Sequence, residues 1–129
     1  MKDTLPETES MALELGKLLE DHHGSDIAVL DMRSLNFWTD FFVLATVTSS
    51  THLSGLERHI KDYSRNSGIE PRRSRKSGVE DEWCLIDLGN IVVHLMTGRS
   101  RSFYELERLW SSAPVIYSSK SSSKSTSSS

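Results

Sequence analysis

Ser50, His52 and Asp87 are the residue types of a nucleophilic triad, in which a histidine accepts the proton of a serine hydroxyl and a carboxylate orients the histidine. Ser50 and His52 lie only two positions apart, in a hydroxyl-rich run that directly precedes a helical pattern. A hydroxyl at such a position is well placed to accept a hydrogen bond from the first N–H groups of the helix. The spacing therefore favours a helix cap over a nucleophile.

Carboxylates could instead hold magnesium for nucleotide transfer, because the order of elements resembles that of a nucleotidyltransferase. Such an enzyme needs a Gly-Ser turn and two or three carboxylates on adjacent strands. Here the turn at 48–50 contains no glycine and no Asp-x-Asp pair follows it. Asp81 and Asp87 are too far apart along a strand to share one ion easily. A divergent nucleotidyltransferase-like enzyme is the alternative interpretation, and no cofactor or metal is expected.

Four other reactive side chains have structural interpretations. His22 and His23 are adjacent, so on a helix they point in different directions, which favours an exposed pair over a metal site. His94 lies in an apolar strand opposite or near Asp87, where it could carry a proton but is better read as half-buried and hydrogen-bonded. Cys84 follows no cationic residue that would lower its pKa and is expected to be a core thiol.

A partner-binding spot is indicated around the predicted hairpin. Trp83 begins an edge-like strand directly after three acidic residues, and Leu88 lies at its end. Tyr104 and Glu107 are neighbours at i, i+3 on a predicted helix, off its apolar stripe. Aromatic side chains rimmed by carboxylates are a common hot spot for a basic partner. Periodicity alone leaves open whether the two rings are instead part of the core.

A basic cluster stands out against an acidic chain. The net charge is -3, and residues 1–117 carry -5 once the two lysines of the tail are left out. Such a domain suits a basic protein partner better than broad nucleic-acid binding. A possible local RNA contact is the cluster Arg72, Arg73, Arg75 and Lys76, which contains no aromatic residue for base stacking.

Periodicity predicts an α/β fold with a mixed sheet flanked by helices. Apolar residues recur at helical spacing in 8–22 and 51–67, and 101–110 is expected to be a short last helix. The predicted strands are 26–33, 40–47, 83–88 and 91–96, and 69–81 is a loop or a short edge strand. Gly89 and Asn90 tolerate the positive φ of a two-residue hairpin turn. A helix between strands two and three is long enough for a parallel crossover.

Length and composition indicate one domain at 1–113 and a disordered serine-rich tail at 114–129. No apolar run approaches the ~18 residues of a membrane span. A single cysteine excludes internal disulfides. Together with a polar, acidic start, this leads us to expect a cytoplasmic protein. A homodimer through an exposed sheet edge is possible.

Several segments, taken in order, resemble the ribosomal silencing factor family, also called Iojap-related, over about residues 12–113. The segments are Asp26-Ile27 through Asp31, Thr39-Asp40-Phe41-Phe42-Val43-Leu44-Ala45-Thr46 with Ser49-Ser50-x-His52, Trp83 through His94, and Tyr104-x-Leu106-Glu107-x-Leu109-Trp110. Two departures are Val47, where the family often has glycine, and Asn90, where it often has aspartate. The basic run at 72–76 is also unusual for the family.

The resemblance implies a fold like the nucleotidyltransferases without their catalytic carboxylates, and no enzymatic activity. It implies a translation repressor that binds the large ribosomal subunit through its protein L-fourteen and blocks joining of the small subunit. The family's contact surface, carried to this chain, falls on Trp83, Asp87, Leu88, Tyr104 and Glu107. The basic run is expected to touch ribosomal RNA beside that surface.

Overall fold

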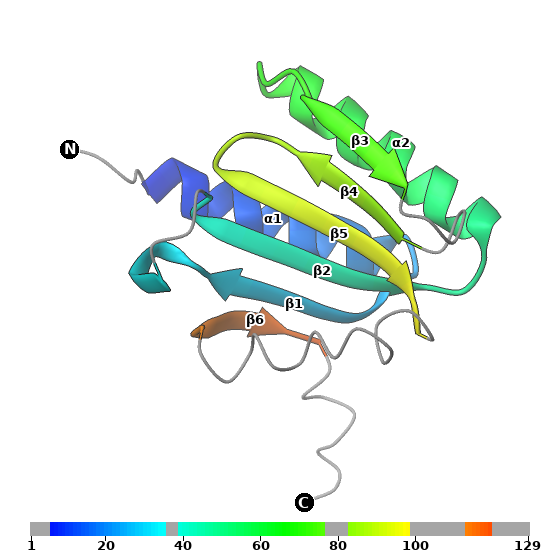
Figure 1. Ribbon diagram of the computed structural model, residues 1–129, viewed down its shortest axis with the longest axis horizontal. Helices are drawn as coiled ribbons and strands as arrows, with labels where there is room; N and C mark the ends of the chain where they lie inside the picture. Colours follow the sequence, from blue (N-terminus) through cyan, green and yellow to red (C-terminus); the bar gives the residue numbers. More distant parts are fainter. Residues whose placement is uncertain (1–5, 36–38, 77–82, 99–112, 120–129) are drawn as a thin grey trace, which may run out of the picture.

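The computed structural model describes residues 6–35, 39–76, 83–98 and 113–119, which form an α/β fold (Figure 1). None of the helices in these ranges is long and apolar enough to cross a membrane. The elements in chain order are α1 (Pro6–Asp21), β1 (Ser25–Asp31), the 3-10 turn η1 (Arg33–Leu35), β2 (Phe41–Val47), α2 (Ser50–Asn66), β3 (Arg73–Lys76), β4 (Trp83–Asp87), β5 (Ile91–Thr97) and β6 (Val115–Ser118).

The strands form one six-stranded mixed sheet in the order β3-β4-β5-β2-β1-β6. Only β2 and β5 run parallel, and the other neighbours are antiparallel. The mixed sheet is confirmed, but the parallel neighbour of β2 is the second strand of the hairpin and not the first. The reason is burial: residues 91–96 of β5 are all buried, whereas β4 alternates. The strand that is apolar on both faces takes the centre of the sheet.

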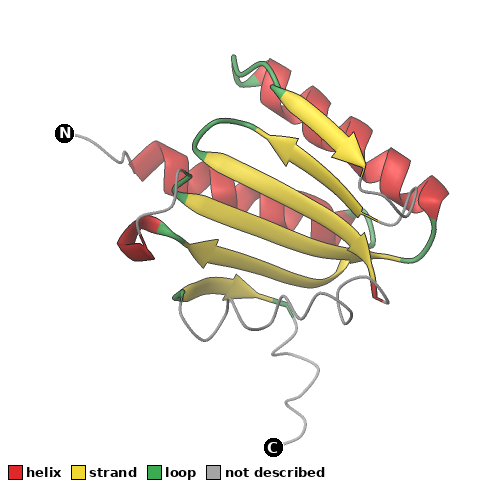
Figure 2. Cartoon of the chain, in the orientation of Figure 1, coloured by secondary structure: helices red, strands yellow, loops and turns green. Residues whose placement is uncertain are grey.

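Both described helices cover the same face of the sheet (Figure 2). From α1, Leu15 and Leu19 are fully buried, and from α2, Leu53, Leu56 and Ile60 are buried at 1% exposure or less. They pack against alternate residues of β1, β2, β4 and β5. The helical spacing of these leucines and the period of two in the strands produce one shared core.

The opposite face of the sheet is apolar as well. Its buried side chains come from β1, β2 and β5 and include Leu30, Phe42, Leu44, Val92 and Met96. The predicted last helix at 101–110 lies outside the described residues. Burial on both faces explains why β1, β2 and β5 read as nearly continuous apolar runs in the sequence.

Each described α-helix is followed by a residue in the left-handed conformation. Gly68, at φ +83, ends α2, and the Ile69 N–H donates back to the Ser64 carbonyl at 2.7 Å. At the end of α1 the left-handed position is taken by His23 at φ 76, one residue before Gly24. Gly24 is needed for a different reason: a Cβ there would lie 2.9 Å from the Leu19 carbonyl oxygen.

Two predictions about the sheet edges were wrong. Trp83 does not begin an edge strand, because β4 lies between β3 and β5. The edge is β3, which is one of the two alternatives for 69–81. At the other edge, β6 pairs with β1, although its residues were assigned to a disordered tail beginning at 114. The apolar residues Val115, Ile116 and Tyr117 precede the serine-rich composition and supply the pairing strand.

Candidate partner-binding site

The β4–β5 hairpin is closed by the predicted turn at Gly89-Asn90. The Leu88 N–H donates to the Ile91 carbonyl at 2.8 Å, so two residues lie between the paired positions. Gly89 has φ +93, whereas Asn90 is not among the residues with positive φ. A positive φ at the first central residue is the requirement of a type II′ turn, which Gly satisfies without strain. The turn thus depends on Gly89, and Asn90 needs no special conformation.

Asp87 organises this turn. Its Oδ1 accepts a hydrogen bond from the Gly89 N–H at 2.8 Å, and its carbonyl oxygen accepts one from the Arg72 N–H, also at 2.8 Å. The residue is half-buried at the end of β4, next to the turn. Its Oδ1 is therefore engaged in holding the hairpin, and a partner that contacts this carboxylate meets a pre-oriented acceptor.

Leu88 lies in the core beneath the turn. Only 6% of the residue is exposed, and it belongs to the cluster that the helices cover. The side chain therefore offers little surface to a partner. A role for Leu88 in binding would be exerted by fixing the position of the hairpin end.

The other predicted contact residues are only partly described. Trp83 begins β4, where its backbone pairs with Met96. Tyr104 and Glu107 lie outside the described residues. The structure thus places Trp83 and Asp87 at the two ends of β4 and Leu88 in the core next to the turn, over a length of about 16 Å at the usual strand rise.

The basic cluster lies at the sheet edge. Arg72 is exposed and immediately precedes β3. Arg73, Arg75 and Lys76 belong to β3 itself, which has β4 as its neighbour in the sheet. The cluster is adjacent to Asp87, because Arg73 pairs with Asp87 in the β3–β4 ladder.

His94 is buried more deeply than the sequence suggested. It is 7% exposed, and its ring lies 4.6 Å from that of Phe42, tilted by 55°. It pairs with Leu85 and Leu44 on the two neighbouring strands, while Asp87 pairs with Val92. Burial lowers the pKa of His94 to about 4, because the apolar surroundings disfavour the imidazolium. A neutral ring at pH 7 argues against proton transfer by this residue.

The imagined triad is not assembled. Asp87 stands beside the end of β5 where β2 begins, since Phe41 pairs with Ile91, whereas Ser50 follows the far end of β2. Seven residues of strand separate these ends by about 20 Å. Ser49, and not Ser50, is the N-cap of α2, because its hydroxyl oxygen accepts the His52 N–H at 3.1 Å.

The ring of His52 has a structural task that the sequence did not reveal. Nδ1 accepts the Thr48 N–H at 3.1 Å, and Nε2 lies 3.1 Å from the His22 carbonyl oxygen. The His22 ring in turn stacks on His59 of α2, with 3.7 Å between centroids and 18° between planes. The wide separation in sequence hid these contacts. Among the described residues no group of three or more His, Cys, Asp or Glu side chains could hold a metal ion.

Comparison with protein families gives a match over residues 5–129 to the model described as ribosomal silencing factor during starvation. A ribosomal silencing factor of Bacillus subtilis is 34% identical over 96 residues, covering 74% of this chain and 80% of that protein. A ribosomal silencing factor of Treponema pallidum is 35% identical over 100 residues, covering 77% of this chain and 88% of that protein. The mouse protein named mitochondrial assembly of ribosomal large subunit protein 1 is 33% identical over 98 residues, covering 74% of this chain and 43% of that protein.

Two solved structures have a similar fold. A crystal structure of a Chromobacterium violaceum protein superposes with a TM-score of 0.70 at 31% identity, covering 84% of this chain and 88% of that one. A crystal structure of a Bacillus halodurans protein superposes with a TM-score of 0.68 at 26% identity, covering 88% of this chain and 99% of that one. By the family match over nearly its whole length and by these relatives, the chain belongs to the ribosomal silencing factor family.

Proposed function

We propose that this protein binds the large ribosomal subunit through its protein L-fourteen and, by its bulk, prevents the small subunit from joining, so that translation is repressed. Membership of the ribosomal silencing factor family is the observation that carries the proposal. The name of the mouse relative also refers to the large subunit. The protein would act in the cytoplasm, where it meets free large subunits.

The charge distribution supports docking on a basic ribosomal protein. The chain has a net charge of -3, and residues 72–76 alone contribute +4, so the remainder carries -7. A carboxylate at position 87 is held at a fixed place by the hairpin turn. Complementary charge raises the rate of encounter and selects against wrong partners. We assign the contact surface to Trp83, Asp87, Tyr104 and Glu107, with Leu88 fixing the position of the hairpin end from the core.

The mechanism requires no covalent step. A rigid domain that occupies part of the intersubunit face excludes the other subunit because two bodies cannot share the space. Rigidity comes from the mixed sheet, whose central strands β2 and β5 are paired at seven positions and are buried at all of these residues except Thr46 and Thr97. We therefore propose a non-enzymatic repressor. Neither a cofactor nor a metal takes part in this mechanism.

Sedimentation of ribosomal subunits with added protein tests the proposal. We expect the protein to migrate with large subunits and the joined particle to decrease as protein is added. Co-migration with small subunits, or an unchanged amount of joined particle at saturation, would refute it.

The contact surface is tested by Trp83→Ala and Tyr104→Ala, each measured for affinity to isolated L-fourteen. Each is expected to weaken binding by about 2 kcal/mol, or roughly thirtyfold. The matched control is Val115→Ala, which truncates an apolar residue that is 43% exposed on β6, at the opposite edge of the sheet from β3. Wild-type affinity in both aromatic variants, with folding verified by circular dichroism, would place the interface elsewhere.

A further inference from the structure

A dense cluster of positive charge lies at one edge of the sheet. Four of the five residues 72–76 are cationic, in a chain whose remainder carries -7. The strand they occupy, β3, forms the end of the six-stranded sheet. On a chain that is otherwise acidic, such a local basic cluster favours the approach of a polyanion to this edge of the sheet.

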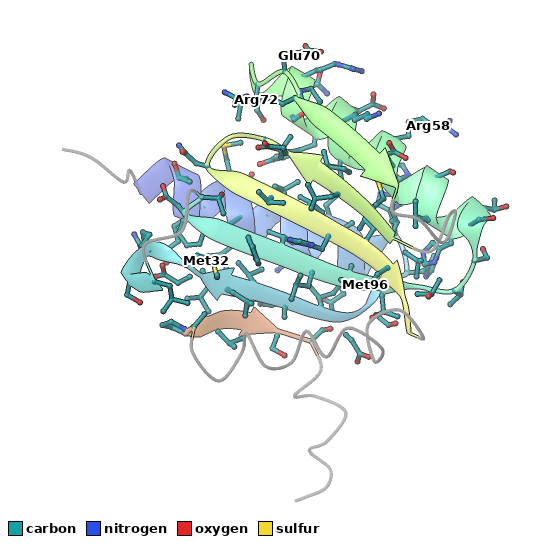
Figure 3. The ribbon with its side chains drawn as sticks, viewed as in Figure 1. Met32, Arg58, Glu70, Arg72 and Met96 are labelled. Atoms are coloured by element: carbon teal, nitrogen blue, oxygen red, sulfur yellow. The ribbon has the colours of Figure 1, made fainter. Side chains whose placement is uncertain are left out.

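Neighbouring cations on this side of the molecule differ in how they are compensated. Lys61 is paired with Glu57 at 3.0 Å, and Arg65 lies 3.5 Å from Glu70. Arg58 on α2 and Arg72 before β3 are both exposed and, among the described residues, neither has an ion-pair partner. Figure 3 shows both on the side of the molecule where α2 and β3 lie. Their charges are available to an external anion.

The edge is better suited to a phosphate chain than to an added β-strand. Cationic residues on an edge strand oppose pairing with another chain, and natural sheets use them for that purpose. Arginine presents a planar fork that matches phosphate oxygens, and three of the four cations are arginine. The absence of aromatic residues from 70–76 argues for contact with the nucleic-acid backbone and not with bases.

We propose that the β3 edge, with Arg72, Arg73, Arg75 and Lys76 as its cations, binds the phosphate backbone of ribosomal RNA next to the docking site. The inference rests on the proposed function, because it assigns a second contact on the same subunit. Arg73 pairs with Asp87 in the β3–β4 ladder, so the RNA contact adjoins the hairpin that is assigned to the protein partner.

Two variants test this edge. The first replaces the four cations by glutamine (Arg72→Gln, Arg73→Gln, Arg75→Gln and Lys76→Gln) and removes the charge. The second replaces the three arginines by lysine and keeps the charge, as a matched control. The affinity of each variant for purified large subunits is measured at about 50 mM and about 200 mM salt, because screening of phosphate contacts increases strongly between these concentrations. Affinity for isolated L-fourteen is measured in parallel.

The glutamine variant is expected to bind subunits about tenfold more weakly at the lower salt concentration and to lose about one unit of salt slope per phosphate contact removed. The lysine variant should keep the slope of the wild type. Binding of both to isolated L-fourteen should not change. An unchanged slope in the glutamine variant overturns the proposal.

Two other results are distinguishable from that one. If the glutamine variant loses affinity for isolated L-fourteen to the same extent as for subunits, the edge contacts protein and not RNA, and the proposal is wrong. If the wild-type protein binds no large subunits at all, the proposed function fails first. Circular dichroism establishes that both variants are folded.

Discussion

The Nε2 of His52 lies 3.1 Å from the carbonyl oxygen of His22, and this hydrogen bond joins the first turn of α2 to the end of α1. Because the His22 oxygen can only accept, Nε2 carries the proton and donates it. Nδ1 is then the acceptor for the Thr48 N–H at 3.1 Å. One neutral imidazole thus fixes the strand-to-helix turn after β2 and the helix-to-strand turn before β1.

Replacing His52 by alanine is expected to lower the free energy of unfolding by about 2 kcal/mol, because two hydrogen bonds of roughly 1 kcal/mol each are lost. Urea unfolding followed by circular dichroism measures the change. Ser54→Ala is the control, since Ser54 is exposed on the same helix. If His52→Ala and Ser54→Ala unfold at the same urea concentration, the bridge contributes nothing to stability.

Two glycine-to-alanine substitutions should have opposite effects on the stability of the protein. At Gly24 a Cβ would lie 2.9 Å from the Leu19 carbonyl oxygen, so Gly24→Ala should destabilise the protein by about 1 kcal/mol or more. At Gly55, inside α2, a Cβ meets no atom within 4 Å, so Gly55→Ala should stabilise it by about 0.5–1 kcal/mol. Thermal melts of both variants are compared with the wild type. A lower melting temperature for Gly55→Ala would contradict the second expectation.

Substitutions of Asp87 separate its role in the turn from its charge. Asp87→Asn keeps an oxygen that can accept the Gly89 N–H and removes the charge, whereas Asp87→Ala removes both. We expect near wild-type stability for the asparagine variant and a loss of about 1 kcal/mol for the alanine variant. Both should bind L-fourteen more weakly, as measured by calorimetry. Full affinity of the asparagine variant would show that the charge is not used.

His94 should make stability fall as the solution is acidified. Its pKa is lowered to about 4 in the fold from an ordinary value of 6.5, so the unfolded chain binds the proton more tightly. The stabilisation is therefore complete above about pH 6.5 and is lost progressively down to about pH 4. By pH 5 the loss amounts to about 2 kcal/mol.

The His94→Leu variant removes this titration while the other four histidines are retained. Its unfolding free energy, measured by urea titration at pH 7 and pH 5, should decrease less between the two values than that of the wild type. The comparison cancels the contributions of the other histidines. Equal decreases in the two proteins would mean that His94 titrates normally.

Local patterns predicted much of the fold. The apolar spacing of Leu15 and Leu19, and of Leu53, Leu56 and Ile60, located both described helices within about two residues. The hairpin and its turn followed from Gly89. These features depend on neighbours in sequence, whose geometry is set by the backbone periodicity itself.

Contacts between residues that are far apart in the sequence were harder to predict. The parallel neighbour of β2 was assigned to the wrong hairpin strand, since sequence order does not state which strand enters the centre. The Tyr117 hydroxyl bonds to Glu20 and the Tyr63 hydroxyl to Glu14, and neither pair has a local signature. For the candidate site, the hairpin turn at Gly89-Asn90 and the family could be predicted from the sequence. The burial of Leu88 was not, because an apolar residue at a strand end can belong either to the core or to the surface.

The position of β6 has a consequence for synthesis of the protein. β1 obtains its second neighbour from residues far along the chain, as in the bond from the Ile27 N–H to the Ser119 hydroxyl across 92 positions. A growing polypeptide that has not yet reached this segment exposes one whole side of β1, with apolar residues on both of its faces. The unpaired edge of β1 is a template for aggregation, and it is covered only after residues 115–119 have been synthesised.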